Sequence, residues 1–351
     1  MAINIARIVD PLIEQIENGV VPWRREWASA TGLPRNHIHS KPYTGTNIIS
    51  CWVHQMVGGY QSNRYVTFDQ VRKLSLKLKH PKGDPRNKSC PILFYKKSEK
   101  IDKDTGEVES FMTGRLWNCF NIEQIAGIVD PDTYPIHDHD PADVRLAIKI
   151  PKALGVEIEG GDPAYVPSRD VIKMPDLSRF TSSDAFMTTL AHECIHATGS
   201  KSRLGRLTDA KFGSEDYAKE ELVAELGAAF IAAEWGISSQ LENHASYLDN
   251  WLKVLREEPN FIVTAASAAQ KATDYIATKL TSWDSDDCHV WYSSSFEAPP
   301  PLHPQVLQLA RSQPKTLGTP HVLPHSKQLL VGTSHTNSLT AYTLWVGLVP
   351  P

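Results

Sequence analysis

The chain has few cysteines, no long hydrophobic run and no strong excess of either charge. Its five cysteines, among 351 residues, are scattered without the spacing of a disulfide framework, as is typical of a reducing compartment. No stretch reaches the roughly 20 apolar residues that a membrane-spanning helix needs. The N-terminal segment 5–20 contains Asp10, Pro11 and Glu14 and is typical of an amphipathic helix, not of an export signal. We therefore expect a soluble, cytoplasmic globular protein that does not interact with membranes.

The charges are unevenly distributed along the chain, although the net charge is only −4. Residues 1–130 carry a net charge of +5, and residues 64–100 within them carry +8. Residues 131–285 carry −9. An asymmetry of this kind suggests that the two halves have different partners, and that the first half binds an anion.

The main motif is His192-Glu193-Cys194-Ile195-His196, in the middle of the chain. On a helix, a spacing of four residues places His192 and His196 on one face, where two imidazoles can bind one divalent cation, most often zinc. Glu193 is then positioned as the general base of a zinc peptidase. Cys194 points away from this face and is expected to pack in the interior. The alternative is a chance pentapeptide on an ordinary helix.

A catalytic zinc site needs a third protein ligand, and a helix downstream offers three carboxylates. The segment 217–235 carries Glu220, Glu221 and Glu225 together with a buried apolar stripe. Glu221 and Glu225 lie four residues apart, so one can bind the metal while the other orients a ligand histidine. The alternative is a solvated acidic face.

The basic N-terminal half interleaves cations with aromatic residues. Lysine and arginine neutralise phosphates, and aromatic rings stack on bases that are unpaired, so single-stranded DNA is the expected partner. The alternative is that most of the aromatic residues belong to the core. The candidate DNA-binding residues are Trp23, Arg24, Arg25, Trp27, Tyr43, Asn47, Arg64, Tyr65, Lys73, Lys77, Lys79, Lys96 and Lys97.

The pattern of elements predicts an α+β protein with two domains. We expect a small α+β DNA-binding domain at 1–130 and a linker at 131–144 that is rich in proline and aspartate. A mainly helical metallopeptidase domain with a short sheet should follow at 145–284, and its strand within 164–175 is the candidate for binding a substrate backbone. The tail at 285–351, dense in proline and poor in charge, is expected to be disordered. Within the first domain, a basic helix is expected through about residue 79, followed by two strands joined by the polar loop 102–107.

Several separate motifs occur in the order found in one known family. They are PWRREW at 22–27, YTGTN at 43–47, the run from Tyr65 to Gln70, Tyr165 with Asp170 and Pro175, HECIH at 192–196, EELVAELGAAF at 220–230 and HASYLDNWLKVL at 244–255. Over residues 5–283 the chain resembles the ArdC-type antirestriction proteins of conjugative plasmids. The tail after residue 284 has no counterpart in this resemblance.

The resemblance implies an N-terminal domain that binds single-stranded DNA and a C-terminal zincin-like domain. In such families the third ligand is the glutamate of an E-x-x-A pattern, which residues 221–224 match. This implies one Zn²⁺ on His192, His196 and Glu221, with other divalent metals accepted in vitro, and leaves Glu225 to orient a histidine.

The implied function is protection of incoming conjugative DNA from host restriction, with Glu193 serving a gluzincin-like metallopeptidase. The absence of a primase-like segment after the zincin domain disfavours a priming role. One alternative is a regulatory zinc peptidase that cleaves a repressor or a restriction-related protein, with the basic domain recruiting a protein partner. Another is a purely structural zinc, which the presence of Glu193 disfavours.

Overall fold

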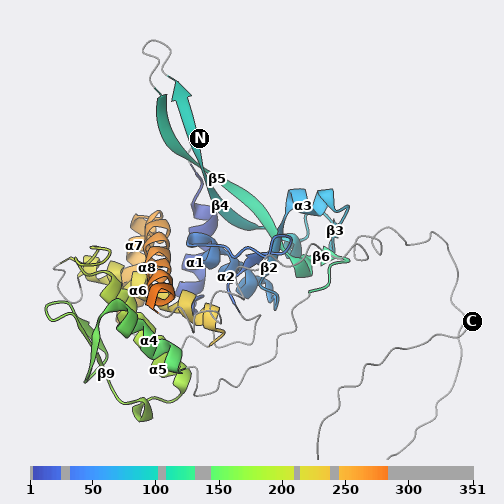
Figure 1. The fold of residues 1–351 in the computed structure, drawn as a ribbon. Coiled ribbons are helices and arrows are strands. Elements are labelled where there is room, and N and C mark those ends of the chain that lie inside the picture. Colours follow the sequence, from blue (N-terminus) through green and yellow to red (C-terminus); the bar gives the residue numbers. More distant parts are fainter. Residues whose placement is uncertain are drawn as a thin grey trace, which may run out of the picture. The chain divides into compact units, whose positions relative to one another are not determined.

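The elements of the chain are a long β-hairpin, two short sheets and a set of packed helices (Figure 1). The computed structural model describes residues 3–24, 32–101, 108–130, 144–208, 214–237 and 245–283. Among these residues, no helix combines the length and the apolar character that crossing a bilayer requires. The expected hairpin loop 102–107, nearly all of the linker 131–144 and the tail 285–351 lie outside the described residues.

The helices end where the sequence signals place their ends. Thr67 forms a capping box with Gln70 at the start of α3, Ser182 caps α5, and glycines at positive φ follow α2 and α6. The helices are α1 (Ala6–Glu17), α2 (Thr46–Gly58), α3 (Phe68–Lys73), α4 (Val144–Leu154), α5 (Ser183–Thr198), α6 (Glu215–Trp235), α7 (Ala245–Glu257) and α8 (Phe261–Trp283).

Three sheets accompany these helices. The largest has the order β1-β2-β5-β4, with β1 parallel to β2 and the other neighbours antiparallel. A two-stranded sheet pairs β3 with β6, and a three-stranded sheet has the order β7-β9-β8. The strands are β1 (Arg35–Asn36), β2 (Arg64–Thr67), β3 (Lys77–Leu78), β4 (Cys90–Ile101), β5 (Val108–Asn121), β6 (Ile125–Ala126), β7 (Glu157–Gly160), β8 (Ala164–Val166) and β9 (Val171–Met174).

The predicted basic helix in the first half is wrong at both ends. Residues 64–67 are strand β2, and α3 stops at Lys73. Ser75 has a φ of 57°, which breaks the helical path, and Lys77 then pairs with β6. The lysines of this segment therefore lie on a short helix, a turn and a strand.

The α+β class is confirmed, and the second half is mainly helical with a short sheet, as expected. One hydrophobic core joins elements from the two expected domains: Trp52 of α2 packs on Phe230 of α6, and Trp23 packs on Trp251 of α7. The division at residues 130 and 145 stays a prediction, and side chains from both segments contribute to this common core.

Candidate metal centre

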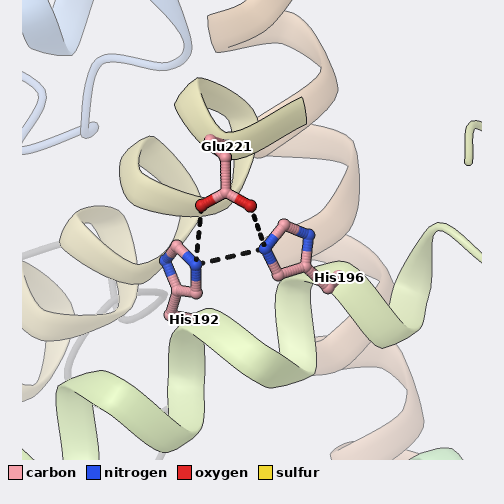
Figure 2. A group of neighbouring side chains, drawn as sticks. All are labelled: His192, His196 and Glu221. Atoms are coloured by element: carbon pink, nitrogen blue, oxygen red, sulfur yellow. Dashed lines mark hydrogen bonds and ion pairs between the residues drawn. The ribbon is translucent and has the colours of Figure 1, made fainter. Parts of the chain in front are cut away.

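Helix α5 places two histidines side by side. His192 and His196 lie one turn apart, with their rings at 82° and their Nε2 atoms 3.1 Å apart (Figure 2). The opposite side of α5 is buried, and Cys194 is fully enclosed there, as the sequence predicts. The two imidazoles are therefore held together on the one face of α5 that borders a cleft.

Helix α6 brings a carboxylate over both histidines. The oxygens of Glu221 lie 3.5 Å from His192 Nε2 and 3.4 Å from His196 Nε2 (Figure 2). In a tetrahedral zinc site with metal–ligand distances of about 2.0–2.1 Å, neighbouring ligand atoms lie about 3.3 Å apart. The three separations are close to this value, so the residues fit one tetrahedral cation with a fourth position left for another ligand.

Close contact between α5 and α6 sets the position of Glu221. Gly227 of α6 lies against Ile195 of α5, and a Cβ atom at Gly227 would be only 2.7 Å from Ile195 Cδ1. The missing side chain therefore lets the two helices approach closely two turns from the metal-binding face.

A second carboxylate orients His196. Glu220 accepts a hydrogen bond from His196 Nδ1 at 3.2 Å, which leaves Nε2 to face Glu221. Arg206 holds Glu220 through two further hydrogen bonds of 2.9 Å. This role was expected for Glu225, and the structure corrects that prediction: Glu225 accepts a bond of 2.8 Å from Arg24 instead. The Nδ1 atom of His192 is buried without a partner among the described residues.

The centre attracts positive charge. Burial opposes a charge on His196, but Glu220 and Glu221 outweigh it and raise the pKa of this imidazole to about 10. Burial also opposes ionisation of Glu221, yet the two histidines hold the pKa of this carboxyl well below its usual range. Either a proton or a metal cation satisfies this cluster, and metal binding must displace the proton.

Glu193 lies next to the edge strand of the small sheet. Its Oε2 accepts a hydrogen bond from the backbone N–H of Tyr165 at 2.6 Å. Because β8 pairs with β9 on one side only, this N–H belongs to the free edge of the sheet. The Tyr165 hydroxyl donates to Asp170, which also accepts two bonds from Arg203 and so anchors β8 near the end of α5.

The metal-binding face opens into a cleft of about 1290 Å³. Its walls come from the β8 region, α5, α6 and the start of α8. All four of the cluster's key side chains, His192, Glu193, His196 and Glu221, line it, so a bound molecule reaches them directly.

Four of the predicted DNA-binding residues instead build the interior. The rings of Trp23 and Tyr65 have no exposed surface, so the prediction that they stack on bases is corrected: a buried ring cannot take a base in this conformation. Tyr43 is half-buried and donates its hydroxyl to a buried cysteine. Asn47 exchanges two hydrogen bonds with the backbone of β4 at Leu93, a structural role.

The two described arginines among these candidates are also buried. Arg24 pairs with Glu225, and the Arg64 guanidinium lies 3.7 Å from Asp130. These two are corrected for the same reason, because their charge is already used inside the protein. Arg25 and Trp27 lie outside the described residues. The candidates that are exposed are Lys73, Lys77, Lys79, Lys96 and Lys97.

Known proteins share both halves of this arrangement. A family model described as a zincin-like metallopeptidase matches residues 147–268, and one described as the N-terminal domain of the anti-restriction factor ArdC matches residues 4–120. The histidine pair on α5 with a glutamate from α6 thus belongs to a zincin-like metallopeptidase domain.

Relatives at the sequence level include DNA primase TraC of Escherichia coli and the uncharacterized protein y4eC of Sinorhizobium fredii. TraC is 35% identical over 291 residues, which are 77% of this chain but only 19% of TraC. The y4eC protein is 32% identical over 283 residues, 77% of this chain and 90% of y4eC.

Solved structures of the antirestriction protein ArdC from plasmid R388 resemble this one along their whole length. The metal-free crystal structure has a TM-score of 0.67 and 30% identity, covering 80% of this chain and 98% of that chain. The Mn(II)-bound structure has a TM-score of 0.65 and 28% identity, covering 80% and 99%. The chain belongs to the ArdC antirestriction family.

Proposed function

We propose that this chain is an antirestriction protein that binds single-stranded DNA through its N-terminal half and holds one zinc ion in a peptidase site in its C-terminal half. The observation that carries the proposal is the convergence of His192, His196 and Glu221 at 3.1–3.5 Å, with Glu193 beside them in the same cleft. The likeness to an Mn(II)-bound ArdC supports a divalent cation, and the histidine-rich ligand set favours zinc.

Each side chain of the centre has a task in peptide hydrolysis. A bound zinc would polarise the scissile carbonyl and make water more acidic. Glu193 would take the proton from the attacking water and pass it to the leaving amine. The free edge of β8 would bind the substrate backbone by strand addition, and the N–H of Tyr165, now held by Glu193, would then turn to the substrate.

Exposed lysines of the first half would neutralise the phosphates of a DNA strand. In a conjugating cell, incoming plasmid DNA enters as a single strand, which is the form this half would cover. The name of the R388 relative supports the protective role, and TraC, a primase, points to DNA as a shared partner.

Two measurements on the full-length chain test the proposal. We expect salt-sensitive binding to labelled single-stranded oligonucleotides of unrelated sequence, with weaker binding to a matched duplex. We also expect zinc-dependent cleavage of a denatured protein substrate, abolished in Glu193→Gln. Cleavage without any DNA binding would favour the regulatory-peptidase alternative, and cleavage by Glu193→Gln at the wild-type rate would remove Glu193 from the reaction.

A further inference from the structure

The two faces of the β4–β5 hairpin differ in what they present. Side chains alternate between the faces along each strand, and the register pairs Phe94 with Arg115 and Lys96 with Thr113. These four residues therefore share one face with Trp117, which pairs with Ile92. We refer to the exposed part of it, Phe94, Lys96, Thr113, Arg115 and Trp117, as the Trp117 face.

The Trp117 face is open and combines rings with cations. Phe94 is 57% exposed and Trp117 is 40% exposed, which is unusual for such large apolar side chains. The guanidinium of Arg115 lies over the Trp117 ring at 4.8 Å. Lys96 is exposed one step further along the hairpin, whose outer half extends beyond α2 (Figure 1).

The opposite face is partly covered by the start of the chain. A Cβ atom at Gly114 would lie 2.1 Å from Ile3 Cδ1, so Ile3 packs directly on the hairpin at this glycine. Arg7 donates a hydrogen bond of 2.7 Å to Asn118 on the same face. The Trp117 face has no such cover from Ile3 or Arg7, and it keeps two large rings in solvent.

We propose that the Trp117 face binds an unpaired DNA strand. Two bases stack on Trp117 and Phe94, and the intervening phosphates contact Arg115 and Lys96. The proposal rests on the single-strand binding inferred above and gives it a site that the N-terminal motifs do not contain. The ring–cation–ring arrangement suits a chain that alternates bases with phosphates.

Charge and shape favour this partner over an acidic protein or a duplex. Residues 92–96 and 113–117 contain no aspartate or glutamate, so no carboxylate in these segments repels a phosphate. A duplex keeps its bases stacked on one another and offers only phosphates, which would leave both rings unused. An unpaired strand uses the rings and the cations together.

The test is a salt series of fluorescence-anisotropy titrations with the full-length chain and a labelled oligonucleotide of unrelated sequence. Stacking contributes about 1–3 kcal/mol per base, so we expect Trp117→Ala to weaken binding by roughly five- to a hundred-fold, and Trp117→Phe to retain most of the affinity. Because these side chains are exposed, the thermal unfolding midpoints of the variants should stay close to wild type.

Lys96 and Lys97 form a matched pair for this test. They are adjacent, of the same type and both exposed, but they lie on opposite faces of the hairpin. Lys96→Ala should lower the slope of log affinity against log salt by about 0.7, the value for one phosphate contact on a single strand, and Lys97→Ala should leave it unchanged.

The outcomes separate this proposal from the function it rests on. A wild-type chain that binds no single strand would overturn both. A wild-type chain that binds tightly, with Trp117→Ala and Lys96→Ala unaltered, would overturn only the assignment to the Trp117 face and would leave single-strand binding to the lysines of α3 and β3. Equal losses in Lys96→Ala and Lys97→Ala would overturn the assignment to one face.

Discussion

Glu220 and Glu221 are sequence neighbours with different tasks, because their side chains leave the helix at different angles. Glu221 points between the two histidines, whereas Glu220 faces the far nitrogen of His196 and is held by Arg206. A carboxylate on the outer nitrogen fixes the tautomer and raises the basicity of a metal-binding imidazole. The residue-scale account of the centre is therefore a chain from Arg206 through Glu220 to His196.

The first prediction concerns this orienting carboxylate. Glu220→Gln should weaken zinc binding by about 10- to 100-fold, because the His196 ring loses its charged partner while all three ligands remain. Competition with a chromophoric chelator measures the affinity. Glu225→Gln is the matched control on the same helix and should bind zinc nearly as the wild type does; a larger loss there than in Glu220→Gln would restore the original expectation for Glu225.

At the scale of elements, the centre depends on how closely α5 and α6 pack. Gly227 and Ile195 meet at this contact, and the ligands His192, His196 and Glu221 lie on the same two helices. Helix propensity alone favours alanine over glycine by about 1 kcal/mol in a helix interior. Steric overlap opposes it here, and overpacking in a core costs about 1–3 kcal/mol.

We therefore predict that Gly227→Ala destabilises the chain by up to about 2 kcal/mol, against its helix propensity. Urea unfolding followed by circular dichroism measures the change. Ile195→Val removes the nearest atom, Cδ1, so the cost of Gly227→Ala should be smaller in that background. A Gly227→Ala variant more stable than the wild type would show that the helices are not in tight contact.

At the scale of the whole molecule, the N-terminal motif PWRREW reaches the peptidase half. Trp23 packs on Trp251 of α7, and Arg24 pairs with Glu225, one turn beyond the ligand Glu221 on α6. The Arg24 and Glu225 side chains are only 11% and 6% exposed. This part of the motif joins the two halves of the chain.

Arg24→Ala should therefore destabilise the chain strongly, by about 3–5 kcal/mol, because it leaves the Glu225 carboxylate buried without its partner. The matched control is Arg72→Ala, which breaks an exposed ion pair with Asp69 and should change stability by less than about 1 kcal/mol. Urea unfolding of both variants makes the comparison. Similar small effects would mean that Arg24 is not part of the interior.

How far the sequence predicts the molecule depends on whether a residue's role is local. The histidine pair, the helix caps at Thr67 and Ser182 and the hairpin follow from spacing and alternation, which are local signals. The role of Glu220 depends on Arg206, fourteen positions away, and no local pattern distinguishes it from Glu225. The burial of Trp23 depends on α7, more than two hundred positions later, so a motif rich in tryptophan and arginine imitates a DNA-binding surface.

A local signal for the exposed aromatics was present but differs from the one sought. The alternation through Phe94 and Lys96, and through Arg115 and Trp117, places rings and cations on one face of a strand pair, whereas a search for clustered aromatics selects the core. Ring exposure is a tertiary property, and it became visible only with the register of β4 and β5.

The metal content of purified protein tests the central claim most directly. Plasma mass spectrometry after dialysis against buffered zinc should find one zinc per chain in the wild type and in Glu193→Gln, and almost none in Glu221→Gln. Both variants replace a buried carboxylate of the same cleft by its amide, so they are matched in size and charge. Full zinc in Glu221→Gln, or its loss in Glu193→Gln alone, would contradict the assignment of His192, His196 and Glu221 as the metal centre.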